Sequence, residues 1–182
     1  MKNVLLVNGS VRPNGTIGKT LKSMEHLLLQ HDIGCTWFQL KPIPQRGCIA
    51  CSSCRETHRC QFDDDQCNEL IEKILAADAV IIGSPVYFAG PNGLLCALLD
   101  RAFFAASNYG ELFRGKAGAA VVSSWREGGT AALDRLNKYF TFAEMNIISS
   151  NYWNSVLNRN DSYGEGIILR LAENLAEYLK KE

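Results

Sequence analysis

The chain has 182 residues, which fits one domain with a full hydrophobic core. Nineteen Lys and Arg balance nineteen Asp and Glu, so the composition gives no electrostatic footprint for nucleic acid or an anionic membrane. The N-terminal residues lack a signal-peptide pattern, and no stretch approaches the ~18 apolar residues of a membrane span. We therefore expect one soluble, cytoplasmic domain over residues 1–182, with neither nucleic acid nor a membrane as its partner.

Apolar runs and helical spacing alternate along the chain. Short apolar runs predict strands at residues 2–8, 33–40, 79–82, 117–122 and 145–150. Apolar residues at helical spacing predict helices at residues 16–30, 65–75, 92–106, 130–143 and 164–181. The alternation predicts an α/β three-layer sandwich, with a five-stranded parallel sheet in the doubly wound order 2-1-3-4-5. The helix at 92–106 is apolar over a wide arc, which the core or a partner must cover.

Three loops are expected to meet at one edge of this sheet. In doubly wound sheets a ligand binds outside the carboxyl ends of the strands, near the point where the strand order reverses. The loops that follow the first, third and fourth strands are residues 9–16, 84–92 and 123–130. We therefore expect the ligand site to be built from these three loops.

The first loop has the features of a phosphate site. It precedes a helix N-terminus, where unpaired backbone N–H groups and the helix dipole favour an anion. Ser10 and Thr16 offer hydroxyl groups, Arg12 offers a guanidinium fork, and Gly15 lets the backbone approach closely. Pro13 stands where a P-loop needs glycine, and the dinucleotide fingerprint G-x-G-x-x-G is absent. A mononucleotide phosphate is the ligand that fits, and a plain turn with a helix cap is the alternative.

The second loop suits a flat, amphipathic ring. Residues 84–90 are a proline-stiffened aromatic segment that follows an apolar strand. Backbone groups there can hydrogen-bond the polar edge of a ring, and Tyr87 or Phe88 can pack on its face. Aromatic residues that fill the core or cover a subunit interface are the alternative.

The loop at about residues 41–64 carries a dense run of thiols. Its spacing is C-x2-C-x2-C-x5-C, formed by Cys48, Cys51, Cys54 and Cys60. Three interpretations stay open: a 4Fe–4S cluster, a zinc or labile redox-thiol site, and a loop without metal. The remaining cysteines, Cys35, Cys67 and Cys96, lie in predicted helices or strands and are interpreted as small core residues.

The segment Gly9-Ser10-x-Arg12-x-x-Gly15 resembles the first signature of the NADPH-dependent FMN reductase family, within the flavodoxin-like superfamily. The resemblance implies that this loop wraps the FMN phosphate through Ser10, Arg12, Asn14, Gly15 and Thr16. It also implies flavin-ring contacts from the other two loops, at Pro85, Val86, Tyr87, Phe88, Ser123, Ser124, Trp125, Gly128 and Gly129. The cysteine spacing resembles that of the iron–sulfur flavoproteins, and the resemblance implies a homodimer or a homotetramer.

The resemblance and the residues together predict an FMN-dependent oxidoreductase. Hydride would pass from NAD(P)H by way of FMN to a small acceptor such as a flavin or a quinone. Because the flavin carries this chemistry, no catalytic side chain is predicted. Two alternatives stay open: electron transfer between FMN and a 4Fe–4S cluster, and a non-enzymatic redox-sensing module that binds flavin.

Overall fold

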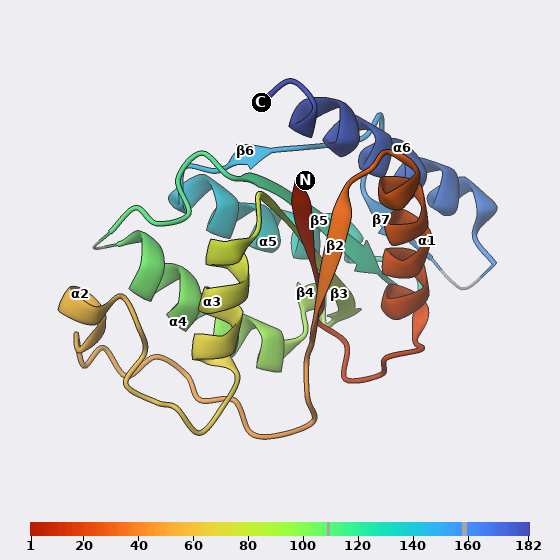
Figure 1. Ribbon diagram of the computed structural model, residues 1–182. Coiled ribbons are helices and arrows are strands. Elements are labelled where there is room, and N and C mark those ends of the chain that lie inside the picture. The colour runs from red at the N-terminus through yellow and green to blue at the C-terminus, as the bar shows by residue number, and fades with distance from the viewer. Residues whose placement is uncertain (109, 158–159) are drawn as a thin grey trace.

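The computed structural model describes residues 1–108, 110–157 and 160–182, with helices on both faces of a central sheet (Figure 1). The helices are α1 (Thr16–Gln30), α2 (Cys54–Thr57), α3 (Cys67–Ala76), α4 (Gly93–Ser107), α5 (Gly129–Phe142) and α6 (Ser162–Leu179). The strands are β1 (Asn3–Asn8), β2 (Gly34–Gln39), β3 (Ala79–Tyr87), β4 (Gly90–Pro91), β5 (Ala117–Ser123), β6 (Asn146–Ile147) and β7 (Ser155–Val156). None of the helices in these ranges has the length and hydropathy that a bilayer crossing requires.

The main sheet is parallel and has the order β2-β1-β3-β5-β6. Val4 of β1 is in register with Cys35 of β2 on one side and with Ala79 of β3 on the other. This arrangement confirms the predicted order 2-1-3-4-5. It brings the carboxyl ends of β1, β3 and β5 to the same edge of the sheet.

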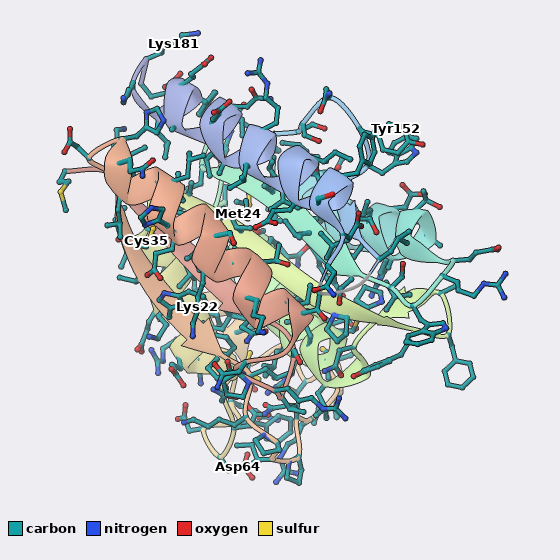
Figure 2. The ribbon with its side chains drawn as sticks, turned by 90° about the vertical axis from the view of Figure 1, so that its right-hand side faces the viewer. Lys22, Met24, Cys35, Asp64, Tyr152 and Lys181 are labelled. Carbon is teal, nitrogen blue, oxygen red and sulfur yellow. The ribbon has the colours of Figure 1, made fainter. Side chains whose placement is uncertain are left out.

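Alternate residues of each strand enter two separate cores, as the two-residue period of a strand requires. On β1, Val4 and Leu6 join the core under α1 and α6. Leu5 and Val7 join the core under α3, α4 and α5. Figure 2 shows α1 and α6 side by side over their face, with Met24 among the side chains of α1.

The second predicted loop is partly a hairpin. Strand β3 continues through residues 84–87 and returns as β4, with Val86 in register with Pro91. The two turn residues Phe88 and Ala89 have φ angles of 50° and 59°, in the left-handed region that a tight hairpin turn requires. Neither is a glycine or an asparagine, so the sequence does not carry the usual hairpin signal.

The last predicted strand is divided in two. Strand β6 pairs with the start of β5, and β7 pairs with its end, so the expected strand at 145–150 contributes only Asn146–Ile147. The backbone N–H of Ile148 still donates to the carbonyl of Gly118, at 2.9 Å. The polar segment that follows leaves the sheet, and pairing resumes at Ser155.

Candidate functional site

The three turns at the carboxyl ends of β1, β3 and β5 enclose a cleft of about 440 Å³. Its lining comes from all three predicted loops, from the start of α1 and from the residue after β7: Ser10, Arg12, Gly15, Thr16, Ile17, Pro85, Val86, Tyr87, Ser123, Ser124, Trp125 and Leu157. The structure therefore brings ten of the predicted site residues together. Ile17 and Leu157 were not predicted, and they give the cleft an apolar component.

The turn after β1 ends at a free helix N-terminus. Gly15 is the N-cap of α1; among the residues that the structure describes no side-chain hydrogen bond caps this end, and the first turn has no acidic residue. Ser10 Oγ accepts from the backbone N–H of Arg12 at 3.2 Å, and the N–H of Gly15 donates to the carbonyl of Arg12 at 3.0 Å. These bonds fold the turn over the start of α1, so Arg12 and the first-turn N–H groups border the same space.

Gly18 allows the turn to lie directly on α1. A Cβ at this position would lie 1.8 Å from the carbonyl oxygen of Pro13 and 3.2 Å from Nδ2 of Asn8. Only the absence of a side chain permits this approach. The shape of the turn therefore depends on a glycine outside the predicted signature.

A network of buried and half-buried side-chain amides supports the first turn. Nε2 of Gln39 donates to the carbonyl of Ser10 at 2.6 Å, and Nδ2 of Asn8 donates to Oε1 of Gln39 at 2.8 Å. Nδ2 of Asn92 donates to the carbonyl of Gly9 at 2.9 Å. Sequence reasoning missed these three amide residues. The available signal was a polar residue, Asn8, that directly follows the apolar run of β1.

The second and third turns contact each other beside the cleft. Gly128 has a φ of +86°, and a Cβ there would lie 2.8 Å from Cα of Ala89 at the tip of the hairpin. Tyr87 is half-exposed and Trp125 is 89% exposed at the rim of the cleft. Two large aromatic side chains are therefore available to cover an occupant.

Four predicted site residues lie outside the cleft lining. Asn14 accepts from Nζ of Lys22 at 3.3 Å through Oδ1, and the side chain of Phe88 is fully exposed. Gly128 and Gly129 line a neighbouring cavity instead. Their roles toward a ligand stay predictions.

The neighbouring cavity encloses about 480 Å³ and shares Ser124 and Leu157 with the cleft. Exposed aromatic rings line one side of it. The ring centroid of Tyr152 lies 6.1 Å from that of Trp153 and 6.3 Å from that of Tyr163. In Figure 2, Tyr152 lies at the edge of the molecule near α6. The cavity extends the cleft toward an open, aromatic surface.

A separate pocket lies in the cysteine loop, which forms the lower part of the molecule in Figure 1. All four predicted ligand cysteines line it: Cys48, Cys51, Cys54 and Cys60. Cys54 is buried at the start of α2, Cys60 is half-buried, and the other two are exposed. Among the residues that the structure describes, no three side chains converge as a formed metal site. The four thiols thus line one pocket, but their sulfur atoms do not converge on a single metal position.

The thiols differ in ionisation. A hydrogen bond with the side chain of Ser53 lowers the pKa of Cys51. Burial raises the pKa of Cys54, and it raises the pKa of Cys67, behind the pocket, to about 12. Because the thiolate is the metal-binding and nucleophilic form, Cys51 is the readier ligand and Cys67 behaves as an inert core thiol.

The cysteine loop is fastened to the core at Cys60. Oδ1 of Asn68 accepts from the backbone N–H of Cys60 at 2.8 Å, and Nδ2 donates to its carbonyl at 2.9 Å. Nη1 of Arg101 donates to Sγ of Cys60 at 3.3 Å, while Nη2 bonds Asp65. Four thiols in one pocket, one of them with a fixed cationic donor, are a donor set that fits a 4Fe–4S cluster.

A doubly wound parallel sheet in the order 2-1-3-4-5, with a ligand cleft where the strand order reverses, is the arrangement of a flavodoxin-like protein. Residues 2–177 match the model of the NADPH-dependent FMN reductase family, and the chain belongs to that family. It is therefore an FMN-binding flavoprotein of the oxidoreductase class.

Individual comparisons agree with this assignment. The chain is 30% identical over 150 residues to iron–sulfur flavoprotein MJ1083 of Methanocaldococcus jannaschii, covering 81% of this chain and 76% of that protein. A flavodoxin from the domain Archaea superposes with a TM-score of 0.65 at 13% identity, covering 99% of each chain. FerB, a flavoenzyme NAD(P)H:(acceptor) oxidoreductase from Paracoccus denitrificans, superposes with a TM-score of 0.64 at 16% identity, covering 97% and 98%. The two structures show the likeness of fold.

Proposed function

We propose that the protein oxidises NAD(P)H by means of FMN bound in the cleft and passes the electrons to a small acceptor such as a flavin or a quinone. One observation carries the proposal: a cleft of about 440 Å³ is lined both by the N-terminus of α1 with Arg12 and by the aromatic residues Tyr87 and Trp125. A phosphorylated, flat, amphipathic ring matches both parts of this lining.

The first turn would hold the phosphate. Backbone N–H groups at the start of α1 and the hydroxyl groups of Ser10 and Thr16 are neutral donors. Arg12 adds a charged fork, which makes shorter and stronger bonds to phosphate than a neutral donor. Asn8, Gln39 and Asn92 hold the turn in this shape before the ligand arrives. Pre-organisation of this kind reduces the entropy that binding costs.

The other turns would orient the ring. Pro85, Val86 and Tyr87 provide one wall, and residues 123–125 provide another. Tyr87 and Trp125 are exposed enough to cover a ring face and to exclude water from it. When bound, FMN supplies the two-electron chemistry, so the chain needs no general acid, general base or nucleophile of its own.

The co-substrate would enter from the neighbouring cavity of about 480 Å³, because this cavity shares Ser124 and Leu157 with the cleft.

Anaerobic stopped-flow mixing tests the proposal. Bound flavin is expected to lose its absorbance with NADH or NADPH and to regain it with quinone, in ping-pong fashion. Flavin that stays oxidised with both nucleotides would refute the NAD(P)H step.

A second function is favoured by the cysteine pocket and by the iron–sulfur flavoprotein relative. We propose that Cys48, Cys51, Cys54 and Cys60 hold a 4Fe–4S cluster and that the protein transfers electrons between this cluster and FMN. Analysis of anaerobically purified protein is expected to give about four irons and four sulfides per FMN. Zinc without sulfide would refute the cluster and favour a zinc site. Protein with neither iron nor zinc would refute the cluster and favour a redox-thiol site or a loop without metal.

The seven cysteines are free in the structure, which suits a reducing compartment such as the cytoplasm. A redox-sensing module without turnover stays the remaining alternative. A protein that binds FMN but neither oxidises NAD(P)H nor contains iron would favour it over both proposals above.

We also propose a homodimer or a homotetramer. The apolar arc of α4 is mostly covered by the protein's own core, since Leu95, Leu98 and Leu99 are fully buried. The support comes instead from aromatic side chains exposed around the two cavities: Phe88, Trp125, Tyr152, Trp153 and Tyr163. Exposed apolar surface of this kind is typical of an interface. Light scattering coupled to size exclusion is expected to give a molar mass of two or four times 20.2 kDa, and a monomer would refute the proposal.

A further inference from the structure

A buried ion pair lies at the cysteine pocket, with Arg101 in the pocket lining, and neither proposal above uses it. Arg101 of α4 and Asp65, which precedes α3, have side chains that are only 2% and 1% exposed. Removing two charges from water is costly, and their attraction alone often fails to repay that cost. The pair therefore calls for an explanation beyond stability.

The pair is held rigidly from its acidic side. Oδ1 of Asp65 accepts from the backbone N–H of Cys67 at 3.0 Å, and Oδ2 accepts from the backbone N–H of Arg46 at 3.1 Å. Oδ2 also accepts a hydrogen bond from Nη2 of Arg101. Asp65 thus joins the start of α3 to the cysteine loop and fixes the plane of the guanidinium.

The other end of the guanidinium is directed at a thiol. Nη1 of Arg101 donates to Sγ of Cys60 at 3.3 Å, and Arg101 is itself part of the pocket that the four cysteines line. Asn68 holds the backbone of Cys60 from both its N–H and its carbonyl. A buried cation is therefore oriented by one partner and presented to a sulfur that is fixed in place by another.

We infer that Arg101 is a positioning residue for the 4Fe–4S centre: oriented by Asp65, it donates to Sγ of Cys60, fixes that ligand and raises the reduction potential of the centre. The inference rests on the proposed cluster in the cysteine loop. Hydrogen bonds to cluster sulfurs and nearby charge set the potentials of such centres. Reduction adds negative charge, which a fixed donor stabilises, so the sign of the effect is a higher potential.

The experiment compares Arg101→Gln with a matched control, Arg135→Gln. Arg135 also pairs with an aspartate of α4, Asp100, at 2.7 Å, but both partners are 45% exposed and do not line the cysteine pocket. Wild-type and variant proteins are purified anaerobically with FMN, and iron and sulfide are counted. The midpoint potential of the cluster is then read from its electron paramagnetic resonance signal during a redox titration.

The expected result is a cluster potential that is lower in Arg101→Gln than in the wild type and unchanged in Arg135→Gln. Equal potentials in Arg101→Gln and the wild type would overturn the inference while leaving the cluster in place. If Arg101→Gln holds no iron, Arg101→Lys is titrated instead, because one ammonium group cannot keep the fork geometry toward Asp65 and Cys60. A lowered potential in it supports the inference, and a wild-type potential overturns it.

A wild-type protein that binds FMN but contains no iron or sulfide would overturn the proposed cluster, and the inference with it. That outcome differs from one in which the wild type contains the cluster and the cluster potential is the same in the wild type and in Arg101→Gln. The two failures are therefore distinguishable within one set of preparations.

Discussion

Substitution of Gly18 by alanine tests whether the first turn has the shape that the phosphate needs. Alanine in a helix interior normally stabilises a protein by about 0.5–1 kcal/mol relative to glycine. Here the new Cβ would lie 1.8 Å from the carbonyl oxygen of Pro13, where real Cβ contacts essentially never fall below 3.0 Å. The carbonyl is backbone, so the turn must retreat from α1 by about 1.2 Å, the difference between these distances.

Overpacking of this kind costs about 1–3 kcal/mol, and a backbone clash belongs near the upper end. The clash therefore outweighs the helix propensity, and we expect Gly18→Ala to lower the free energy of unfolding by about 2 kcal/mol. The displaced turn also carries Arg12. We expect FMN affinity to fall at least about tenfold, which corresponds to ~1.4 kcal/mol.

The matched control is Gly166→Ala in α6, where an added Cβ meets no atom within 4 Å. Propensity alone acts there, so this variant is expected to gain about 0.5–1 kcal/mol and to bind FMN normally. Urea unfolding of the FMN-free proteins gives the stabilities, and quenching of flavin fluorescence gives the affinities. A Gly18→Ala protein as stable as the Gly166→Ala protein, with wild-type FMN affinity, would refute the reasoning.

Three further predictions concern the phosphate, the buried pair and the thiols. Arg12→Ala is expected to weaken FMN binding by about 1.5–3 kcal/mol and to leave riboflavin binding unchanged, because riboflavin lacks the phosphate. Calorimetric titration with both ligands measures the two affinities, and an equal loss for both would show that Arg12 contacts the ring instead. Arg101→Met is expected to cost about 3–5 kcal/mol of stability in urea, whereas Arg135→Met in an exposed pair costs less than about 1 kcal/mol, and similar losses would contradict the burial argument. Because the pKa of Cys51 is lowered and that of Cys67 is raised to about 12, alkylation of metal-free protein at pH 8 is expected at Cys51 and not at Cys67, with the Cys51 rate rising at a lower pH than for an ordinary thiol. Peptide mass spectrometry over a pH series would detect the opposite order.

Local patterns in the sequence were sufficient to predict most of the sheet. The helix predicted at residues 16–30 and the strand at 117–122 are close to α1 and β5, because apolar periodicity and adjacent turn signals define their limits. The hairpin at Tyr87 was missed because its turn residues, Phe88 and Ala89, adopt left-handed φ angles that local propensity disfavours. Contacts with Gly128 in a distant loop accompany that conformation.

Much of the candidate site could also be predicted, since the parallel sheet brings the three turns together. The support of the site could not. Gln39 lies 29 residues from Ser10, and Asp65 lies 36 residues from Arg101, so neither contact leaves a periodic or spacing signal. The four cysteines were recognisable from their spacing, but only the structure places Arg101 among them.

The most direct test of the central claim is a crystal structure of the protein soaked with FMN. The phosphate is expected at the N-terminus of α1, within hydrogen-bonding distance of Ser10, Arg12 and Thr16, with the ring between the second and third turns. A phosphate bound elsewhere, or a cleft that stays empty under saturating FMN, would contradict the account.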